Sequence, residues 1–131
     1  MRATLPGMGG DGTTVELVAR RAYDSPARGD GRRVLVDRVW PRGVSKEALA
    51  ADAWVKDVAP SDGLRKWFNH DPERWDEFRE RYFKELDGNP EGLEALYREL
   101  RGVKQATLLF AARDEEHNNA VALVEYLQRG R

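Results

Sequence analysis

Two short apolar runs are the feature that most limits how this chain can fold. Residues 33–39 (RVLVDRV) and 105–112 (QATLLFAA) are rich in β-favouring residues, and each holds several consecutive apolar positions. Such runs are typical of strands that are covered on both faces, as in a parallel sheet. A looser alternation over residues 15–23 (VELVARRAY) predicts a further strand.

Helical patterns lie between and after these runs. Helices are expected after Ser45, from Ser61, from Asp71-Pro72 to about Asp87, from Asn89-Pro90 to Gly102, and after a cap at Asp114. A connection through helices usually makes two strands parallel, with a right-handed crossover. We therefore expect an α/β fold in which a small, mostly parallel sheet is flanked by helices in a single domain.

Length and composition set further bounds. The 131 residues suit one α/β domain over residues 14–131, and the glycine-rich residues 1–13 are expected to form a flexible leader. The 22 basic and 23 acidic side chains nearly balance, which argues against a globally basic nucleic-acid-binding protein. The absence of cysteine excludes thiol chemistry and permits a cytoplasmic location. No apolar run approaches the length of a membrane span, so no membrane partner is expected.

The segments that follow the two apolar runs are expected to meet. Parallel strands end at the same sheet edge, and ligands of open α/β sheets bind outside that edge. Residues 37–43 (DRVWPRG) and 113–118 (RDEEHN) would then share a pocket lined by Asp37, Arg38, Arg42, Arg113, Asp114 and His117. Arginines would hold a phosphate-like or carboxylate group by paired hydrogen bonds. His117, with Asp37 or Asp114, would carry any proton transfer.

Each of these residues has a purely structural alternative. The Asp and Arg side chains could pair with one another only to hold loops together. Asp114 could be a plain helix N-cap. His117 could be a hydrogen-bonded core histidine that points inward with Ala120 and Val121 on one helical face.

Three more residues are candidates for ligand binding. Trp40 leaves its strand inside the expected pocket, where it could stack on a ligand ring or close the pocket floor. Asn118, like its neighbour Asn119, could orient a ligand or face water, and His70 could cover the pocket or cap the preceding helix. Asp114, His117 and His70 lack the spacing of a known metal motif, so neither a metal nor a cofactor is expected.

Four blocks of the sequence carry a family resemblance. They are residues 33–46 (RVLVDRVWPRGVSK), 54–61 (WVKDVAPS), 64–72 (LRKWFNHDP) and 108–118 (LLFAARDEEHN). Together they resemble the YeaO-like proteins, a bacterial and archaeal family of unknown function numbered 488, over roughly residues 14–128. The resemblance implies a small cytosolic α/β protein, and it brings no established reaction, substrate or cofactor.

Three classes of function stay open on the sequence. The first is a pocket for a small anionic ligand at the carboxyl edge of the sheet, used by a hydrolase or a group-transfer enzyme. The second is the same pocket in a non-catalytic ligand-sensing or protein-interaction module. The third is a nucleic-acid-associated protein, against which the mixed charges of residues 73–86 argue. The sequence does not indicate an oligomeric state.

Overall fold

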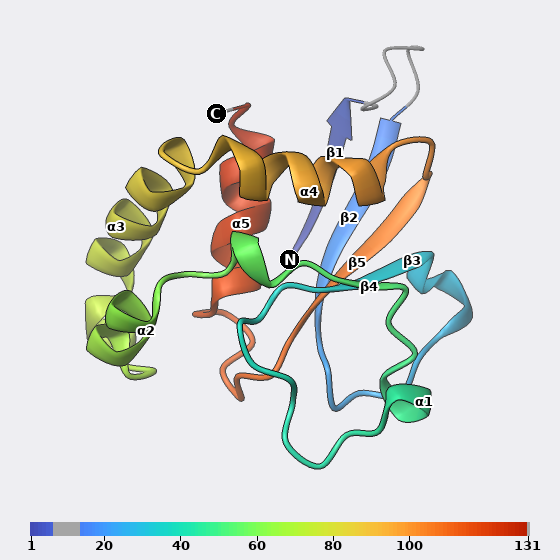
Figure 1. The fold of residues 1–131 in the computed structure, drawn as a ribbon, viewed down its shortest axis with the longest axis horizontal. Coiled ribbons are helices and arrows are strands. Elements are labelled where there is room, and N and C mark those ends of the chain that lie inside the picture. The colour runs from blue at the N-terminus through green and yellow to red at the C-terminus, as the bar shows by residue number, and fades with distance from the viewer. Residues whose placement is uncertain (7–13, 131) are drawn as a thin grey trace.

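The chain is built on a five-stranded sheet, seen here in a computed structural model that describes residues 1–6 and 14–130 (Figure 1). The spatial order of the strands is β1-β2-β5-β3-β4. Their bounds are β1 (Arg2–Pro6), β2 (Thr14–Arg21), β3 (Arg32–Leu35), β4 (Ala53–Trp54) and β5 (Gln105–Phe110). β1 is antiparallel to β2, and every other neighbouring pair is parallel. This confirms the predicted α/β fold with a mostly parallel sheet.

The central strand β5 sets where the parallel strands end. Leu109 of β5 lies opposite Leu35 of β3 on one side and Arg20 of β2 on the other. The carboxyl ends of these strands therefore share one edge of the sheet, as the sequence analysis expected. β3 is shorter than the predicted run over residues 33–39, although the Val36 N–H still donates to the carbonyl of Leu109 at 3.1 Å.

The first strand corrects one prediction. Residues 2–6 form the edge strand β1 instead of part of a flexible leader, and residues 7–13 lie outside the described residues. Ala3 and Leu5 alternate with exposed neighbours and are buried in the core. Alternation of this kind over only five residues carries too little signal to stand out beside the glycines that follow it.

Most of the helices begin at the caps that the sequence suggested. The α-helices are α1 (Lys46–Leu49), α2 (Asp62–Phe68), α3 (Trp75–Asp87), α4 (Pro90–Leu100) and α5 (Asn119–Gln128). Short 3-10 turns are η1 (Arg28–Asp30), η2 (Lys56–Val58) and η3 (Pro72–Arg74). Ser45, Ser61 and Asn89 cap α1, α2 and α4 by accepting a backbone N–H. Within the described residues, no helix is long and apolar enough to cross a membrane.

The last helix begins later than predicted. Its cap is Asn118, whose side chain accepts the N–H of Val121, and not Asp114. Asp114 instead accepts the N–H groups of Glu116 and His117, which closes a turn before the helix. His117 consequently lies in that turn and not on the helical face that the sequence pattern suggested.

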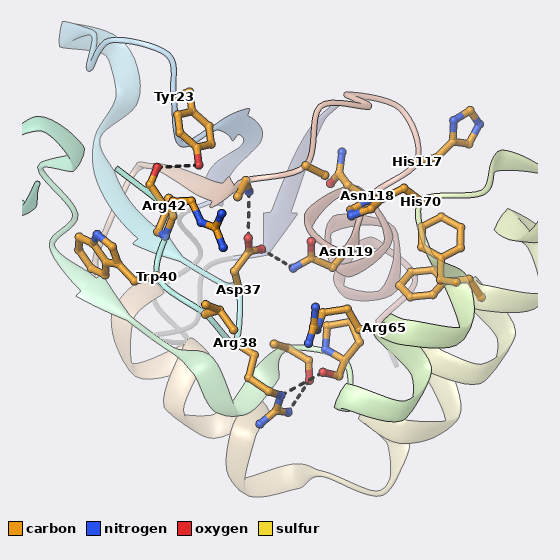
Figure 2. A pocket seen from close by; sticks show the side chains of 18 residues that line it. Tyr23, Asp37, Arg38, Trp40, Arg42, Arg65, His70, His117, Asn118 and Asn119 are labelled. Atoms are coloured by element: carbon orange, nitrogen blue, oxygen red, sulfur yellow. Dashed lines mark hydrogen bonds between the residues drawn. The ribbon is translucent and has the colours of Figure 1, made fainter. Parts of the chain in front are cut away.

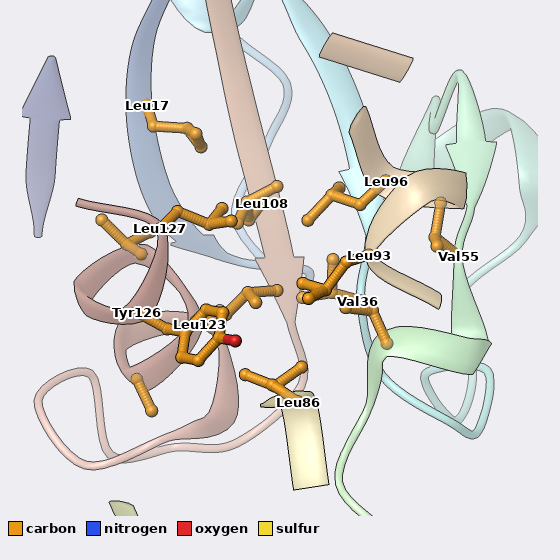
Figure 3. Close-up of a cluster of buried hydrophobic side chains, with 14 of the residues drawn as sticks. Leu17, Val36, Val55, Leu86, Leu93, Leu96, Leu108, Leu123, Tyr126 and Leu127 are labelled. Carbon is orange, nitrogen blue, oxygen red and sulfur yellow. The ribbon is translucent and has the colours of Figure 1, made fainter. Parts of the chain in front are cut away.

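The main core lies on one face of the sheet, where α4 and α5 pack (Figure 3). Val36 and Leu108 point into it from the strands, and Leu96 and Leu123 meet them from the helices. These side chains are almost fully buried. Since burial of one leucine side chain stabilises a fold by about 1.5–3 kcal/mol, this layer holds the strand ends in fixed relative positions.

The opposite face of the sheet is closed by a smaller cluster and an ion network. Leu35, Leu49 and Leu109 form the apolar part. Asp30 lies beside them, almost fully buried, and accepts hydrogen bonds from the guanidinium groups of Arg20 and Arg33. Because a buried carboxylate is stable only when it is paired, this network fixes the loop between β2 and β3.

Candidate functional site

A cavity of about 460 Å³ lies at the carboxyl ends of the parallel strands. Its walls come from the segments that follow β2, β3 and β5, from α2, α3 and the start of α5, and from the loop after η2 (Figure 2). The lining residues are Tyr23, Asp37, Arg38, Val39, Trp40, Pro41, Arg42, Ala59, Pro60, Arg65, Phe68, His70, Phe78, Ala111, Ala112, His117, Asn118 and Asn119. Ligand pockets of proteins commonly have this size and this kind of mixed lining.

Asp37 stands at the centre of the site, in the first turn of chain after β3. One carboxylate oxygen accepts the backbone N–H of Ala111 at 2.9 Å, and the other accepts the side-chain amide of Asn119 at 3.0 Å. Asp37 therefore joins the exit of β3 to the exit of β5 and to the first residue of α5.

The surroundings of Asp37 change its acidity. Burial raises the pKa of this carboxyl above its ordinary value, because a charged carboxylate is less stable away from water. The two hydrogen bonds and the positive charges of Arg65 and His70 act in the opposite direction, and they offset only part of the rise. Asp37 is thus a carboxylate held at a net energetic cost.

Arg38 is occupied by the backbone. Its guanidinium donates to the carbonyls of Pro60 and Ala59, each at 3.2 Å. These bonds tie the β3 exit to the loop after η2. Neutral carbonyls do not cancel the positive charge, so Arg38 still contributes a cation to the cavity lining.

Arg42 is the least constrained cation of the lining. Its side chain is exposed, and its guanidinium makes no hydrogen bond or ion pair with any residue that the structure describes. Its backbone carbonyl accepts the hydroxyl of Tyr23 at 3.0 Å, which anchors the turn that presents the side chain. Figure 2 shows Arg42 and Arg65 on different sides of Asp37.

Arg65 reaches the same cavity from α2. The helix period places it one turn before Phe68, which also lines the cavity. Arg65 has one weak, exposed ion pair with Asp62, at 3.3 Å. Arg65 was not among the predicted site residues, although its helical spacing from Phe68 could have identified it.

His70 lies at the corner between α2 and η3, on the cavity wall, in an unusual conformation. Its φ angle is +55°, directly after Asn69 at +48°. Two consecutive non-glycine residues in the left-handed region are uncommon, and each carries a steric cost. The ring is exposed and lies near enough to Asp37 to act on its pKa.

His117 and Asp114 form a pair at the outer end of the cavity. The Nδ1 atom of His117 lies 2.9 Å from a carboxylate oxygen of Asp114, and the ring packs edge-on against Trp75 at a centroid distance of 5.3 Å. Burial acts to raise the pKa of Asp114, but the hydrogen bonds from Glu116 and His117 outweigh it and lower the pKa. Figure 2 shows the His117 ring well away from Asp37.

The structure separates the predicted site residues into two groups. Asp37, Arg38, Trp40, Arg42, His70, His117 and Asn118 line the cavity, whereas Arg113 and Asp114 do not. Arg113 is exposed in the loop after β5, because that loop continues away from the cavity before α5 begins. Asp114 borders the site through its contact with His117 and through its backbone carbonyl, which accepts the side-chain amide of Asn118.

Two lining residues have structural duties that limit their freedom. The indole N–H of Trp40 donates to the carbonyl of Val44 at 2.6 Å, and the ring packs edge-on against Trp54. Asn118 is buried as the cap of α5 and donates to the carbonyl of Asp114. Asn119, the polar neighbour of Asn118 that could likewise orient a ligand, is the asparagine that reaches Asp37.

The lining combines cationic, acidic and apolar side chains. Its three arginines are Arg38, Arg42 and Arg65, its one carboxylate is Asp37, and Phe68 and Phe78 supply apolar side chains. No serine, threonine or cysteine is among the described lining residues, so the usual side-chain nucleophiles are absent there. Across the described ranges, no three His, Asp or Glu side chains gather closely enough to hold a metal ion.

Comparison with known proteins places these residues in a wider group. Residues 16–130 match the family model described as the inactive DUF488-N3 subclade. The chain is 42% identical to an uncharacterised protein of Mycobacterium tuberculosis (strain H37Rv) over 107 residues, which is 82% of this chain and 89% of that protein. It is 36% identical to the uncharacterised protein YeaO of Escherichia coli K12 over 114 residues, which is 87% of this chain and 98% of that protein. The search of solved structures gave no significant match.

Proposed function

The chain belongs to the DUF488 family of YeaO-like proteins, and we propose that it binds a small organic anion without transforming it. The binding site is the cavity at the carboxyl edge of the sheet. The observation that carries this proposal is Arg42, an exposed guanidinium on the cavity wall with no partner among the described residues. A guanidinium in such a position is suited to a carboxylate or phosphate group.

The charge of the whole lining supports an anionic ligand. Arg38, Arg42 and Arg65 outnumber the single carboxylate of Asp37. No ion pair joins Asp37 to any of these arginines within the part of the chain that is described. The apolar wall of Phe68 and Phe78 suits an organic body attached to the anionic group.

Several features favour binding over catalysis. The family model that matches the chain is described as an inactive subclade. Asp37 is held by two hydrogen-bond donors, and the His117–Asp114 pair lies apart from it at the outer end of the cavity (Figure 2). General acid–base catalysis needs such groups within hydrogen-bond reach of one reacting atom.

A hydrolase or group-transfer enzyme is the second candidate. The observation in its favour is the His117–Asp114 contact, since a carboxylate that orients a histidine ring is a common arrangement in enzymes. On that hypothesis His117→Ala abolishes turnover of a bound compound. On the binding hypothesis no turnover is found, and His117→Ala changes affinity only slightly.

The test compares two exposed arginines, Arg42 on the cavity wall and Arg113 outside the cavity lining. A panel of phosphorylated and carboxylated metabolites is screened by thermal shift on the full chain, because a ligand of the folded state raises its stability. Affinities of the stabilising compounds are then measured by calorimetry for the wild type, Arg42→Gln and the matched control Arg113→Gln. A lost charged hydrogen bond weakens binding by about 1.5–3 kcal/mol, or roughly 10- to 100-fold.

We expect that loss for Arg42→Gln and unchanged affinity for Arg113→Gln, which lies outside the cavity lining. Both side chains are exposed, so both variants should keep the wild-type free energy of unfolding to within about 0.5 kcal/mol. The proposal fails when no anion stabilises the wild type, or when both variants weaken binding equally.

A further inference from the structure

We propose that the ligand of this cavity carries, besides its anionic group, an amino- or amidine-type N–H group that donates to Asp37. This inference rests on the proposed function, and it narrows the ligand to one chemical class. The arginines would hold the anionic group, and the carboxylate between them would hold the N–H group (Figure 2).

The carboxylate of Asp37 has unused acceptor capacity. A carboxylate has about four lone-pair sites, and two donors, the Ala111 N–H and the Asn119 amide, occupy one site on each oxygen. Asp37 lines the cavity and forms no ion pair with another described residue. It can therefore accept a further hydrogen bond from a ligand.

The carboxylate of Asp37 is half-buried. A carboxylate that is partly removed from water is unfavourable unless it is paired or fully hydrogen-bonded. The two donors that it has are neutral, and burial still raises the pKa of Asp37. A ligand N–H would supply the missing donor, whereas a ligand with only anionic groups would add repulsion.

The side-chain amide of Asn119 has a defined orientation. Its Nδ2 atom donates both to the carbonyl of Val36 at 3.1 Å and to Asp37 at 3.0 Å, which fixes the amide because both partners are acceptors. Its Oδ1 atom then remains without a donor among the described residues. A second acceptor beside the carboxylate matches an N–H₂ or amidine edge, which offers two donors side by side.

The simplest competing account gives Asp37 a structural duty alone. In that account it joins β3, β5 and α5, and ligand selection ignores it. The two accounts differ in one property, which is the preference between ligands that differ by a single amino group.

The test uses matched pairs of probe anions on the full chain. The pairs are guanosine and inosine 5′-monophosphate, 4-aminobenzoate and benzoate, and phenylalanine and 3-phenylpropionate. Dissociation constants are measured by calorimetry for the wild type and Asp37→Asn. In the wild type we expect the amino-bearing member of at least one pair to bind about 10- to 100-fold more tightly, the usual effect of a hydrogen bond to a charged group.

In Asp37→Asn that preference should fall to about twofold or less, while the member without the amino group binds at least as tightly as before. Equal binding of both members of every pair to the wild type would overturn this inference and leave the proposed function standing. A preference that persists in Asp37→Asn would also overturn it. Binding of none of the probes would overturn the proposed function itself. If Asp37→Asn does not fold, the preference of the wild type for the amino-bearing probes alone decides whether the inference holds.

Discussion

Replacing His70 by glycine should separate the stability of the fold from its ability to bind. His70 has a φ angle of +55° and follows Asn69 at +48°. A non-glycine residue in this region costs roughly 1–2 kcal/mol through the clash of its Cβ atom with the backbone. The exposed ring of His70 accepts and donates no hydrogen bond within the described residues, so no hydrogen bond of the ring offsets that cost.

The expected change in stability is a small gain. His70→Gly removes about 1–2 kcal/mol of strain, while the added freedom of the unfolded chain subtracts about 0.4–1 kcal/mol. The free energy of unfolding should therefore stay equal or rise by up to about 1.5 kcal/mol. A gain of 1 kcal/mol corresponds to a rise of about 3–5 °C in the melting temperature of a domain of this size.

The expected change in binding has the opposite sign. The His70 ring lines the cavity, so its loss should weaken anion binding. Asn69→Gly is the matched control, since Asn69 has nearly the same backbone conformation and does not line the cavity. It should raise stability by less, because asparagine tolerates this conformation better than most residues, and it should leave affinity unchanged.

Urea unfolding of the free proteins and calorimetry with a stabilising anion measure the two effects. A fall of more than 1 kcal/mol in the free energy of unfolding of His70→Gly would refute the strain argument. Unchanged affinity in the same variant would remove His70 from the site.

Two further predictions concern the carboxylates of Asp30 and Asp37. Asp30→Asn should lower the free energy of unfolding by about 3–5 kcal/mol, because it leaves Arg33 buried beside a neutral partner; the exposed control Glu77→Gln should change it by less than 0.5 kcal/mol. Burial acts to raise the pKa of Asp30, but its hydrogen bonds outweigh that effect and lower the pKa. The loss of stability caused by Asp30→Asn should therefore shrink as the pH falls below 3.8. A loss that does not change with pH would refute the ion pairing of Asp30. Burial raises the pKa of Asp37, so the free energy of unfolding of the wild type should increase relative to that of Asp37→Asn as the pH falls from 7 toward 3.8. A difference between the two proteins that does not change with pH would contradict this prediction.

The sequence was sufficient to predict which segments meet at the sheet edge, because strand polarity decides this. Once residues 33–39 and 105–112 are taken as parallel strands joined through helices, their exits must lie at one edge, and Asp37 and Asn118 are indeed there. Tyr23 follows β2 at the same edge, so the same rule could have identified it.

The exact membership of the cavity lining depended on local geometry that the sequence does not specify. Asp114 and Asn118 are both good caps, and only the folded loop shows that Asn118 begins the helix. That shift of four residues moves Arg113 and Asp114 out of the cavity lining and brings Asn119 to Asp37.

The most direct test of the account is a crystal structure with a stabilising organic anion bound. The account predicts electron density inside the cavity, with the anionic group against the guanidinium of Arg42 or Arg65 and an N–H group within hydrogen-bond distance of Asp37. A ligand bound elsewhere, for example on the exposed loop beside Arg113, would contradict it.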